Sequence, residues 1–279
     1  MKDTSKYILA IDSSGSSLSV ALLENHLIRT EKFLNISNQH SVNLLPALDS
    51  MMQEVEKSYD DLSAVAVTVG PGSFTGIRIG VSTANTMAYG LDIPVVGISA
   101  LEALAFPYRN QMNIILPVFD ARGGRLYGAF FRQGKRITAD QQFVDRDLPE
   151  LVEEQFLNRD SAELFFNRDF KDQLQNRDSS KTLKNQDSNQ FSLEKQSITI
   201  LGDGFMMAQT LLAELDLRLT PRESVLTKQD YISASSIGYL AWEILEKNSN
   251  LYEKGYIEPV KPNYCVITQA ERNLAKKKK

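Results

Sequence analysis

The stretch Val67-Thr68-Val69-Gly70-Pro71-Gly72-Ser73-Phe74-Thr75-Gly76-Ile77-Arg78-Ile79-Gly80 decides the fold of this chain. An unbroken apolar and β-branched run over residues 64–69 predicts a strand that is buried on both faces. A Gly-Pro-Gly turn ends this strand, and helical spacing of apolar residues follows over 75–89. The free amides at the start of that helix would point into the crevice beyond the strand, where an anion could bind. The loop is not a Walker loop, because no Lys-Ser or Lys-Thr pair follows its glycines, and it does not match Gly-x-Gly-x-x-Gly.

The sequence around this stretch alternates between strand-like and helix-like periods. Residues 7–11, 18–23 and 27–33 predict strands, the last two joined by a hairpin at Glu24-Asn25-His26. Residues 41–57 then predict a helix, and residues 94–98 predict the next strand. Strands and helices alternating in this order are typical of an α/β domain.

The second half of the chain repeats the pattern of the first. A predicted strand over 113–119 ends at Asp120 and leads through a turn into a strand over 126–131, as residues 8–12 lead into 18–23. A strand over 198–201 leads through Gly202-Asp203-Gly204 into a helix over 205–215, as residues 64–69 lead through Gly70-Pro71-Gly72. A final helix is predicted over 233–246, capped by Ser233 or Ser235. We therefore predict two similar α/β lobes that face a cleft, each a mixed sheet flanked by helices.

The predicted domains are an N-terminal lobe over residues 1–100, a C-terminal lobe over 101–260 and a C-terminal segment over 261–279 that ends in four lysines. Within the second lobe, residues 155–197 are polar, and Asn-Arg-Asp or a close variant recurs there every nine residues. A nine-residue period can indicate a calcium-binding β-roll, but this stretch has no glycine for the tight turns of such repeats. We interpret it as a polar insertion without chemistry.

Composition limits the classes of function. The chain has 279 residues, 42% of them hydrophobic, with one cysteine, two histidines and a net charge of -4. Without the last four lysines, 27 basic side chains stand against 35 acidic ones, so the body is a poor binder of a phosphate backbone by itself. The apolar run at the N-terminus is too short for a signal peptide, and no run could span a membrane. We expect a cytoplasmic protein with a reduced cysteine.

Two predicted helices carry unusual faces. Over 41–57, a stripe of Leu44, Leu48, Met51 and Val55 is widened beyond what a single sheet usually needs, by Val42, Leu45 and Met52. Over 75–89, small residues recur every four positions, at Gly76, Gly80, Ala84 and Ala88. Each glycine inside a helix costs about 1 kcal/mol relative to alanine, so the ridge needs a packing reason. Both faces could pack on the chain's own sheet or on the helices of another chain.

The remaining polar residues leave alternatives open. Asp12, Asp120 and Asp203 each follow a strand and precede a glycine-bearing turn, which favours a nucleotide cleft; aspartate is also a common turn residue. Arg78 lies near a helix start, where a cation opposes the helix dipole. It could pair with a carboxylate or with an anion held by the glycine loop, and the structural salt bridge is the favoured alternative. Cys265 is expected to pack as a small apolar residue.

Four segments resemble the TsaB family, also called YeaZ. They are GPGSFTGIRIGVSTANTMAYGLDIPVVGISALEALA at 70–105, ILAIDSSGSSLSVAL at 8–22, HSVNLLP at 40–46 and DARGGRLYGAF at 120–130. The resemblance implies the two-lobed fold of actin, sugar kinases and Hsp70 (the ASKHA fold). It also implies a noncatalytic subunit that binds and activates its catalytic paralogue TsaD and acts with the ATPase TsaE. That complex transfers threonylcarbamoyl from its adenylate to the adenosine beside the anticodon of tRNAs that read codons beginning with A.

The resemblance also implies sites and partners. The partners are TsaD and TsaE, with tRNA bound only through the complex, a homodimer possible alone and no membrane. No cofactor is expected beyond weak ATP or ADP binding. The expected partner interface comprises Leu44, Leu45, Leu48, Met51, Met52, Gly76, Gly80, Ala84, Met87 and Ala88. A vestigial nucleotide cleft would comprise Asp12, Gly70, Gly72, Ser73, Asp120, Gly202, Asp203 and Gly204.

The histidines argue against a metal site. The catalytic paralogue holds its metal with two histidines four residues apart on a helix, whereas His26 and His40 are fourteen residues apart. We therefore predict no metal and disfavour a metalloprotease. An ATP-dependent phosphotransferase that uses Asp12 and Asp120 remains the main alternative function.

Overall fold

The computed structural model describes residues 5–36, 39–144, 147–153, 156, 197–222, 225–248, 250–256 and 258–265. The nine-residue repeats and the lysine tail lie outside these residues.

In the first sheet, three adjacent strands pair in parallel, and the other two are joined by antiparallel pairing. Its order is β3-β2-β1-β4-β5, in which β1 pairs antiparallel with β2 and parallel with β4. Every residue of β1 is buried, as the apolar run predicts. The strands are β1 (Tyr7–Asp12), β2 (Leu18–Glu24), β3 (Leu27–Leu34), β4 (Leu62–Gly70) and β5 (Val95–Ser99).

The second sheet has the same topology. Its main path is β10-β7-β6-β11-β12, with β6 antiparallel to β7 and parallel to β11. The predicted strand over 126–131 is interrupted, and its end forms a small hairpin, β8 (Phe131–Arg132) with β9 (Lys135–Arg136). The duplicated α/β fold is thereby confirmed. The main strands are β6 (Ile114–Asp120), β7 (Arg125–Gly128), β10 (Gln141–Val144), β11 (Ser197–Leu201) and β12 (Arg218–Leu219).

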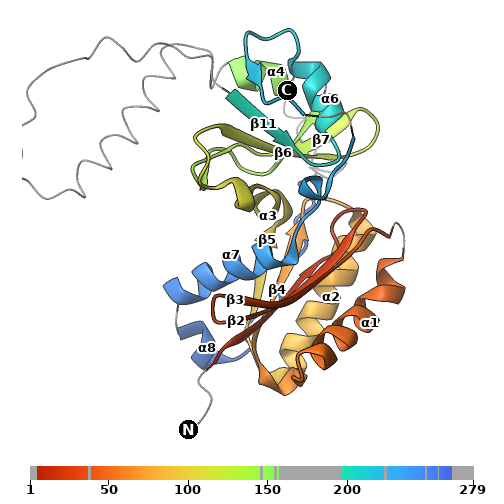
Figure 1. Cartoon of the computed structure of the whole chain (residues 1–279), viewed down its shortest axis with the longest axis vertical. Helices are drawn as coiled ribbons and strands as arrows, with labels where there is room; N and C mark the ends of the chain where they lie inside the picture. Colours follow the sequence, from red (N-terminus) through yellow and green to blue (C-terminus); the bar gives the residue numbers. More distant parts are fainter. Residues whose placement is uncertain are drawn as a thin grey trace, which may run out of the picture.

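Helices form three layers around the two sheets (Figure 1). The outer face of the first sheet packs on α1 (His40–Glu54) and α2 (Phe74–Leu91). The outer face of the second packs on α4 (Asp147–Val152) and α6 (Phe205–Leu212). Between the sheets lie α3 (Ala100–Ala105) and α7 (Ala234–Lys247), followed by α8 (Asn250–Lys254).

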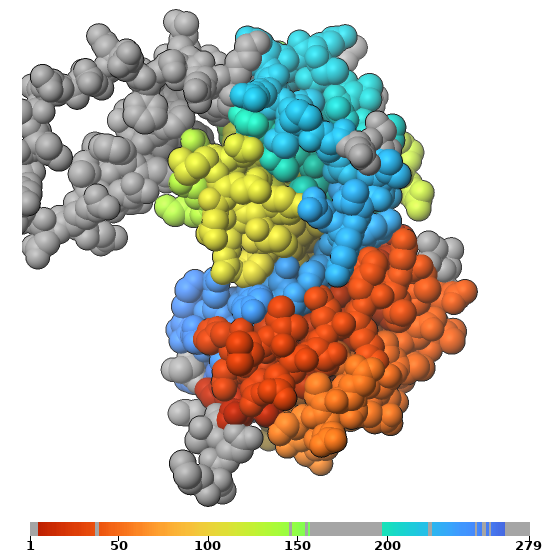
Figure 2. Space-filling view, viewed as in Figure 1, coloured from red at the N-terminus to blue at the C-terminus, as the bar shows by residue number. Residues whose placement is uncertain are grey.

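The position of α7 corrects one predicted boundary. The sequence placed this helix in the lobe spanning 101–260, but it packs on β1 and β2 of the first sheet. Gly238 permits this packing, because a Cβ there would lie 2.2 Å from Cδ1 of Leu23. Figure 2 shows the blue C-terminal part of the chain lying against the red first lobe. The chain therefore crosses back to its first lobe after completing the second sheet.

The start of α7 is capped by a distant strand. Ser233 is its N-cap residue, as predicted, but the side chain makes no capping hydrogen bond. The carboxylate of Glu31 on β3 instead accepts from the amide of Ser235 at 3.1 Å, and the hydroxyl of Ser19 accepts from the amide of Ala234 at 2.8 Å. Both contacts satisfy free amides at the helix N-terminus.

Candidate functional site: the outer helices and the strand-end turns

The turn after β1 packs into the first two turns of α2. The hydroxyl of Ser13 donates to the carbonyl of Gly76 at 2.9 Å, and the amide of Ser73 donates to the carbonyl of Ser14 at 2.6 Å. A Cβ on Gly76 would lie 2.0 Å from the carbonyl oxygen of Ser13, and one on Gly80 would lie 2.4 Å from its hydroxyl oxygen. The glycine ridge therefore exists for close approach of the chain's own backbone.

This packing corrects most of the expected partner interface. Eight of its ten residues are buried in the isolated chain, and the ridge faces the first sheet and its turn. Periodicity predicted that these residues are buried but left open what covers them, and the resemblance assigned them to the interface with another chain. Only Leu45, which is exposed, and Met87, which is half-buried, keep accessible side chains. The eight that belong to the chain's own interior are Leu44, Leu48, Met51, Met52, Gly76, Gly80, Ala84 and Ala88.

An apolar surface nevertheless remains on α1 and α2. Val42, Leu45 and Phe74 are 70%, 55% and 53% exposed. A groove runs between the two helices beside these residues. We use the name α1–α2 face for these three exposed residues together with the lining of the groove. Phe74 was not identified from the sequence, although its position at the helix start, outside the small-residue ridge, is a usable signal. The groove is lined by Ser41, Leu44, Leu45, Phe74, Thr75, Arg78, Ile79, Ser82 and Thr83.

Arg78 on this face forms no salt bridge with any of the described residues, contrary to the expectation. Its Nε donates to the hydroxyl of Tyr264 at 2.9 Å, and its guanidinium carbon lies 3.8 Å from the ring centre of Phe74. The rings of Phe74 and Tyr264 are 5.0 Å apart. Two aromatic rings thus support the cation, and one of them comes from the far end of the chain.

The predicted nucleotide cleft has two halves. The first half, which consists of Asp12, Gly70, Gly72 and Ser73, is a tightly packed turn. Oδ1 of Asp12 accepts from Thr68 Oγ1 at 2.6 Å, Ser14 Oγ at 2.7 Å and Ser14 N at 3.1 Å. Its Oδ2 is buried and has no hydrogen-bond partner among the described residues. Burial raises the pKa of Asp12, and the hydrogen bonds and the nearby charge of His40 oppose that rise.

The glycines of this first half are in contact with protein atoms. A Cβ on Gly72 would lie 2.3 Å from the carbonyl oxygen of Ser14, and one on Gly70 would lie 2.2 Å from that of Asn263. Both glycines also have positive φ, of 153° and 114°. Ser73 is the N-cap residue of α2, and its hydroxyl accepts from the amide of Gly76 at 3.2 Å.

The second half, which consists of Asp120, Gly202, Asp203 and Gly204, lies at the ends of β6 and β11. Oδ1 of Asp203 accepts from the amide of Asp120 at 2.9 Å, and burial raises the pKa of Asp203. The amide of Gly202 donates to Asp230 at 3.1 Å, and a Cβ on Gly204 would lie 2.6 Å from Leu126. Within the described ranges, no hydrogen bond joins this half to the first. The nucleotide cleft therefore stays a prediction.

An ion pair that no sequence pattern predicted lies beside this second half. Arg222 donates through Nη1 and Nη2 to the two carboxylate oxygens of Asp230, both at 2.7 Å, and its guanidinium lies over the ring of Phe205. Burial would raise the pKa of Asp230, but the bonds from Arg222, Thr227 and Gly202 outweigh burial and lower it. The pair holds the loop before α7 against the glycine turn after β11.

His26 and His40 do not lie together as ligands of one metal ion. His26 is exposed and lies 3.1 Å from Glu246, whereas the buried Nε2 of His40 donates to the carbonyl of Ser17 at 3.0 Å. Over the part of the chain that the structure describes, no group of three or more His, Cys, Asp or Glu residues could hold a metal. Burial raises the pKa of the half-buried Cys265 to about 11, which makes this thiol a poor nucleophile.

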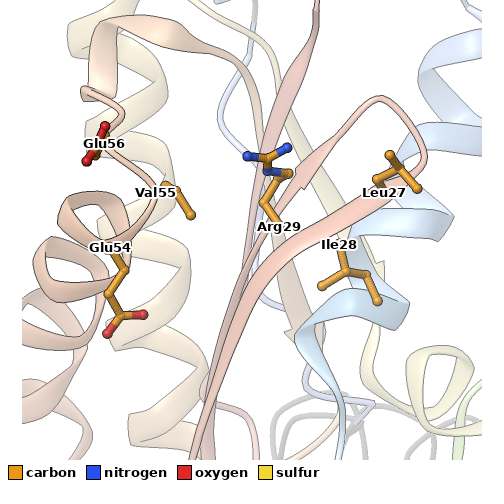
Figure 3. A pocket seen from close by; sticks show the side chains of 6 residues that line it. All are labelled: Leu27, Ile28, Arg29, Glu54, Val55 and Glu56. Atoms are coloured by element: carbon orange, nitrogen blue, oxygen red, sulfur yellow. The ribbon is translucent and has the colours of Figure 1, made fainter.

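A second hollow lies between the end of α1 and the edge strand β3 (Figure 3). Two of its three charged residues have ion-pair partners, because Arg29 pairs with Glu24 at 3.0 Å and Glu54 pairs with Lys32. The α1–α2 face combines exposed apolar side chains with Arg78, which has no ion-pair partner among the described residues, and it is therefore the stronger candidate for binding. The hollow is lined by Leu27, Ile28, Arg29, Glu54, Val55 and Glu56.

Comparisons with known proteins agree with the resemblance. The family model "TsaD: tRNA N6-adenosine threonylcarbamoyltransferase" matches residues 34–176. A Bacillus subtilis protein named "tRNA threonylcarbamoyladenosine biosynthesis protein TsaB" is 37% identical over 164 residues, which cover 56% of this chain and 72% of that protein. The Escherichia coli protein of the same name is 32% identical over 151 residues, which cover 53% of this chain and 65% of that protein.

The likeness to solved structures concerns the fold. A structure described as YeaZ from Pseudomonas aeruginosa superposes with a TM-score of 0.58 at 19% identity, covering 91% of this chain and 99% of that one. The shared architecture is the predicted two-lobed ASKHA fold. No helix among the described residues is both long enough and apolar enough to cross a membrane.

Proposed function

Because this chain belongs to the TsaB family of tRNA threonylcarbamoyladenosine biosynthesis proteins, we propose that it is the noncatalytic subunit that docks on TsaD and activates it. TsaD, acting with TsaE, transfers the threonylcarbamoyl group from its adenylate to the adenosine beside the anticodon. This chain contacts tRNA only through the complex.

The exposed α1–α2 face is the observation that carries this proposal. Its large apolar side chains Val42, Leu45 and Phe74 lie on helices whose opposite sides are already packed on the first sheet. Burying a side chain of this size on binding contributes about 1.5–3 kcal/mol. Two helices of a paralogous partner would cover the face by forming a four-helix bundle. The same surface would serve a homodimer when TsaD is absent.

A structural role fits the distribution of histidines. The catalytic paralogue needs a histidine pair on one helix, whereas here His26 follows β2 and His40 begins α1. Activation then depends on docking, because a subunit that binds the productive conformation of TsaD more tightly than other conformations shifts TsaD toward it.

The test is partner binding by two matched variants. Leu45→Asp changes an exposed side chain on the α1–α2 face, and Met206→Asp changes an equally exposed side chain on α6, as both are 55% exposed. We expect light scattering after size-exclusion chromatography to show a complex with TsaD from the same cell for the wild type and Met206→Asp, but not for Leu45→Asp. Thermal melts should show that both variants are folded.

Opposite outcomes would redirect the assignment. Equal binding by Leu45→Asp and the wild type would remove the α1–α2 face from the proposal. Threonylcarbamoyl transfer by this chain without TsaD would contradict a noncatalytic role. Turnover of ATP that is lost in Asp120→Ala would favour the phosphotransferase alternative instead.

A further inference from the structure

The C-terminal strap, residues 258–265, is fastened along α2. The side-chain amide of Asn85 pairs with Val260 in both directions, since Nδ2 donates to the Val260 carbonyl and Oδ1 accepts from its amide, each at 3.0 Å. Farther along, the amide of Asn263 donates to the carbonyl of Val69 at 2.7 Å. These three hydrogen bonds fix the path of the strap from the middle of α2 to the end of β4.

The strap delivers Tyr264 to the α1–α2 face. The Tyr264 hydroxyl accepts from Nε of Arg78, while the guanidinium stacks on Phe74. Stacking and the single Nε bond restrain the plane of the guanidinium. They leave the two Nη groups, which carry four of its five N–H donors, available.

No carboxylate within the described residues lies at ion-pair distance from Arg78, whose side chain is exposed. The cation lies in the first turns of α2, where the helix dipole disfavours it. No acidic side chain in the described part of the chain compensates this charge, in contrast to Arg222, whose two Nη groups both bind Asp230. A ligand that brings a planar acid to the Nη groups would supply the compensation.

The surroundings of Arg78 identify the acid. Leu45, Phe74 and Ile79 line the same groove together with serine and threonine side chains, and Arg78 is the single charged residue among the described residues of that lining. A phosphate backbone requires several cations, whereas one arginine within an apolar groove fits an amphipathic helix that carries one carboxylate. We infer that Arg78 binds an aspartate or glutamate on the docking helix of the partner, and that Tyr264 of the C-terminal strap positions it. This inference rests on the proposed function and names the charge that the face recognises.

This assignment is tested by measuring the affinity of the full-length protein and its variants for full-length TsaD. Arg78→Glu is compared with Arg218→Glu, which makes the same change of charge at an exposed site on β12 of the second lobe. We expect Arg78→Glu to weaken binding by about tenfold or more, because like charges then meet at the interface. Arg218→Glu should stay within about twofold of wild type. The difference in affinity between Arg78→Glu and the wild type should shrink as the salt concentration rises from about 0.05 M to about 0.5 M.

The positioning role of Tyr264 needs its own comparison. Tyr264→Phe keeps the ring and removes the hydroxyl, so we expect a loss of about twofold to fivefold in the wild-type background. In an Arg78→Ala background the same change should have no effect, because no guanidinium remains to be positioned. Unaltered melting curves would show that the variants are folded.

The results separate this inference from the proposed function. If Leu45→Asp abolishes binding while Arg78→Glu binds like wild type, the docking function stands and the assignment of Arg78 is wrong. An equal loss from Tyr264→Phe with and without Arg78 would overturn the positioning role. If the wild type does not bind TsaD at all, both proposals fail together.

Discussion

The hydroxyl of Ser13 donates a hydrogen bond to the backbone carbonyl of Gly76 at 2.9 Å, across 63 positions of the sequence. The same two residues are also in close steric contact, because the Ser13 carbonyl oxygen occupies the space into which a Cβ on Gly76 would extend. The turn after β1 and the start of α2 are therefore one packed unit. The glycine loop that resembles an anion site is filled by the chain's own backbone at this point.

Gly76→Ala is expected to destabilise the protein despite the better helix propensity of alanine. Alanine should gain about 1 kcal/mol within a helix. Displacing the Ser13 carbonyl should cost more, for a net loss of roughly 1–3 kcal/mol, as for other overpacked sites. Urea unfolding measures the difference.

The control for this prediction lies in the same helix. Apart from its chain neighbours and the backbone of its own helix, no heavy atom of the described residues lies within 4 Å of a Cβ built on Gly90, which is exposed. Gly90→Ala should therefore stabilise the protein by about 0.5–1 kcal/mol. Stabilisation by both substitutions would show that the Ser13 turn can move away from α2 without loss.

Asp12→Asn is expected to raise stability at neutral pH. The amide oxygen can keep the three hydrogen bonds that Oδ1 accepts, and the substitution removes a buried charge whose Oδ2 has no partner among the described residues. The Nδ2 group that replaces Oδ2 also has no partner there but carries no charge, so we expect a gain of roughly 1 kcal/mol from removing the buried charge.

The pH dependence of the free energy of unfolding provides a second test of the role of Asp12. Because burial raises the pKa of Asp12 above its unfolded value, this residue makes stability fall as pH rises from the unfolded pKa to the folded one. Asp12→Asn should remove that slope. Asp12→Ala should instead lower stability, since Ser14 and Thr68 would lose their acceptor. A wild-type slope that persists in Asp12→Asn would contradict the assignment.

Arg222→Leu is expected to destabilise the protein by about 3–5 kcal/mol, because it leaves the carboxylate of Asp230 buried without its cation. The lowered pKa of Asp230 in the wild type contributes stability above its unfolded pKa and loses it as pH falls through the folded value. The deficit of the variant should therefore shrink toward acidic pH. Urea unfolding of Arg222→Leu and of the exposed control Arg218→Leu at several pH values measures this.

Glu31→Ala is expected to loosen the start of α7. Removing the carboxylate leaves the Ser235 amide without its acceptor, and loss of a helix cap costs about 0.5–2 kcal/mol. Hydrogen exchange should accelerate in the first turn of α7 more than in α2. Glu31→Gln keeps an acceptor oxygen and should lie between wild type and Glu31→Ala. Equal exchange in all three proteins would show that β3 does not cap the helix.

The local structure followed closely from the sequence. The run over 64–69, its Gly-Pro-Gly turn and the helical spacing after it became β4 and α2, and the same pattern around Gly202 became β11 and α6. These predictions succeeded because burial on both faces, glycine turns and helical periodicity depend on neighbouring residues. The repeated order of the patterns likewise revealed the duplication of the sheets.

The tertiary structure decided where these elements make contact. Periodicity marked Ala84 and Leu48 as buried, but it does not distinguish the chain's own sheet from a partner, and the structure places both inside the chain. Contacts such as Glu31 with Ser235, or Arg78 with Tyr264, join residues 204 and 186 positions apart. The sequence by itself determined the strands and glycine turns around which each sheet is built, and that this pattern occurs twice. Only the folded chain decided which faces stay exposed, because exposure depends on how distant segments pack together.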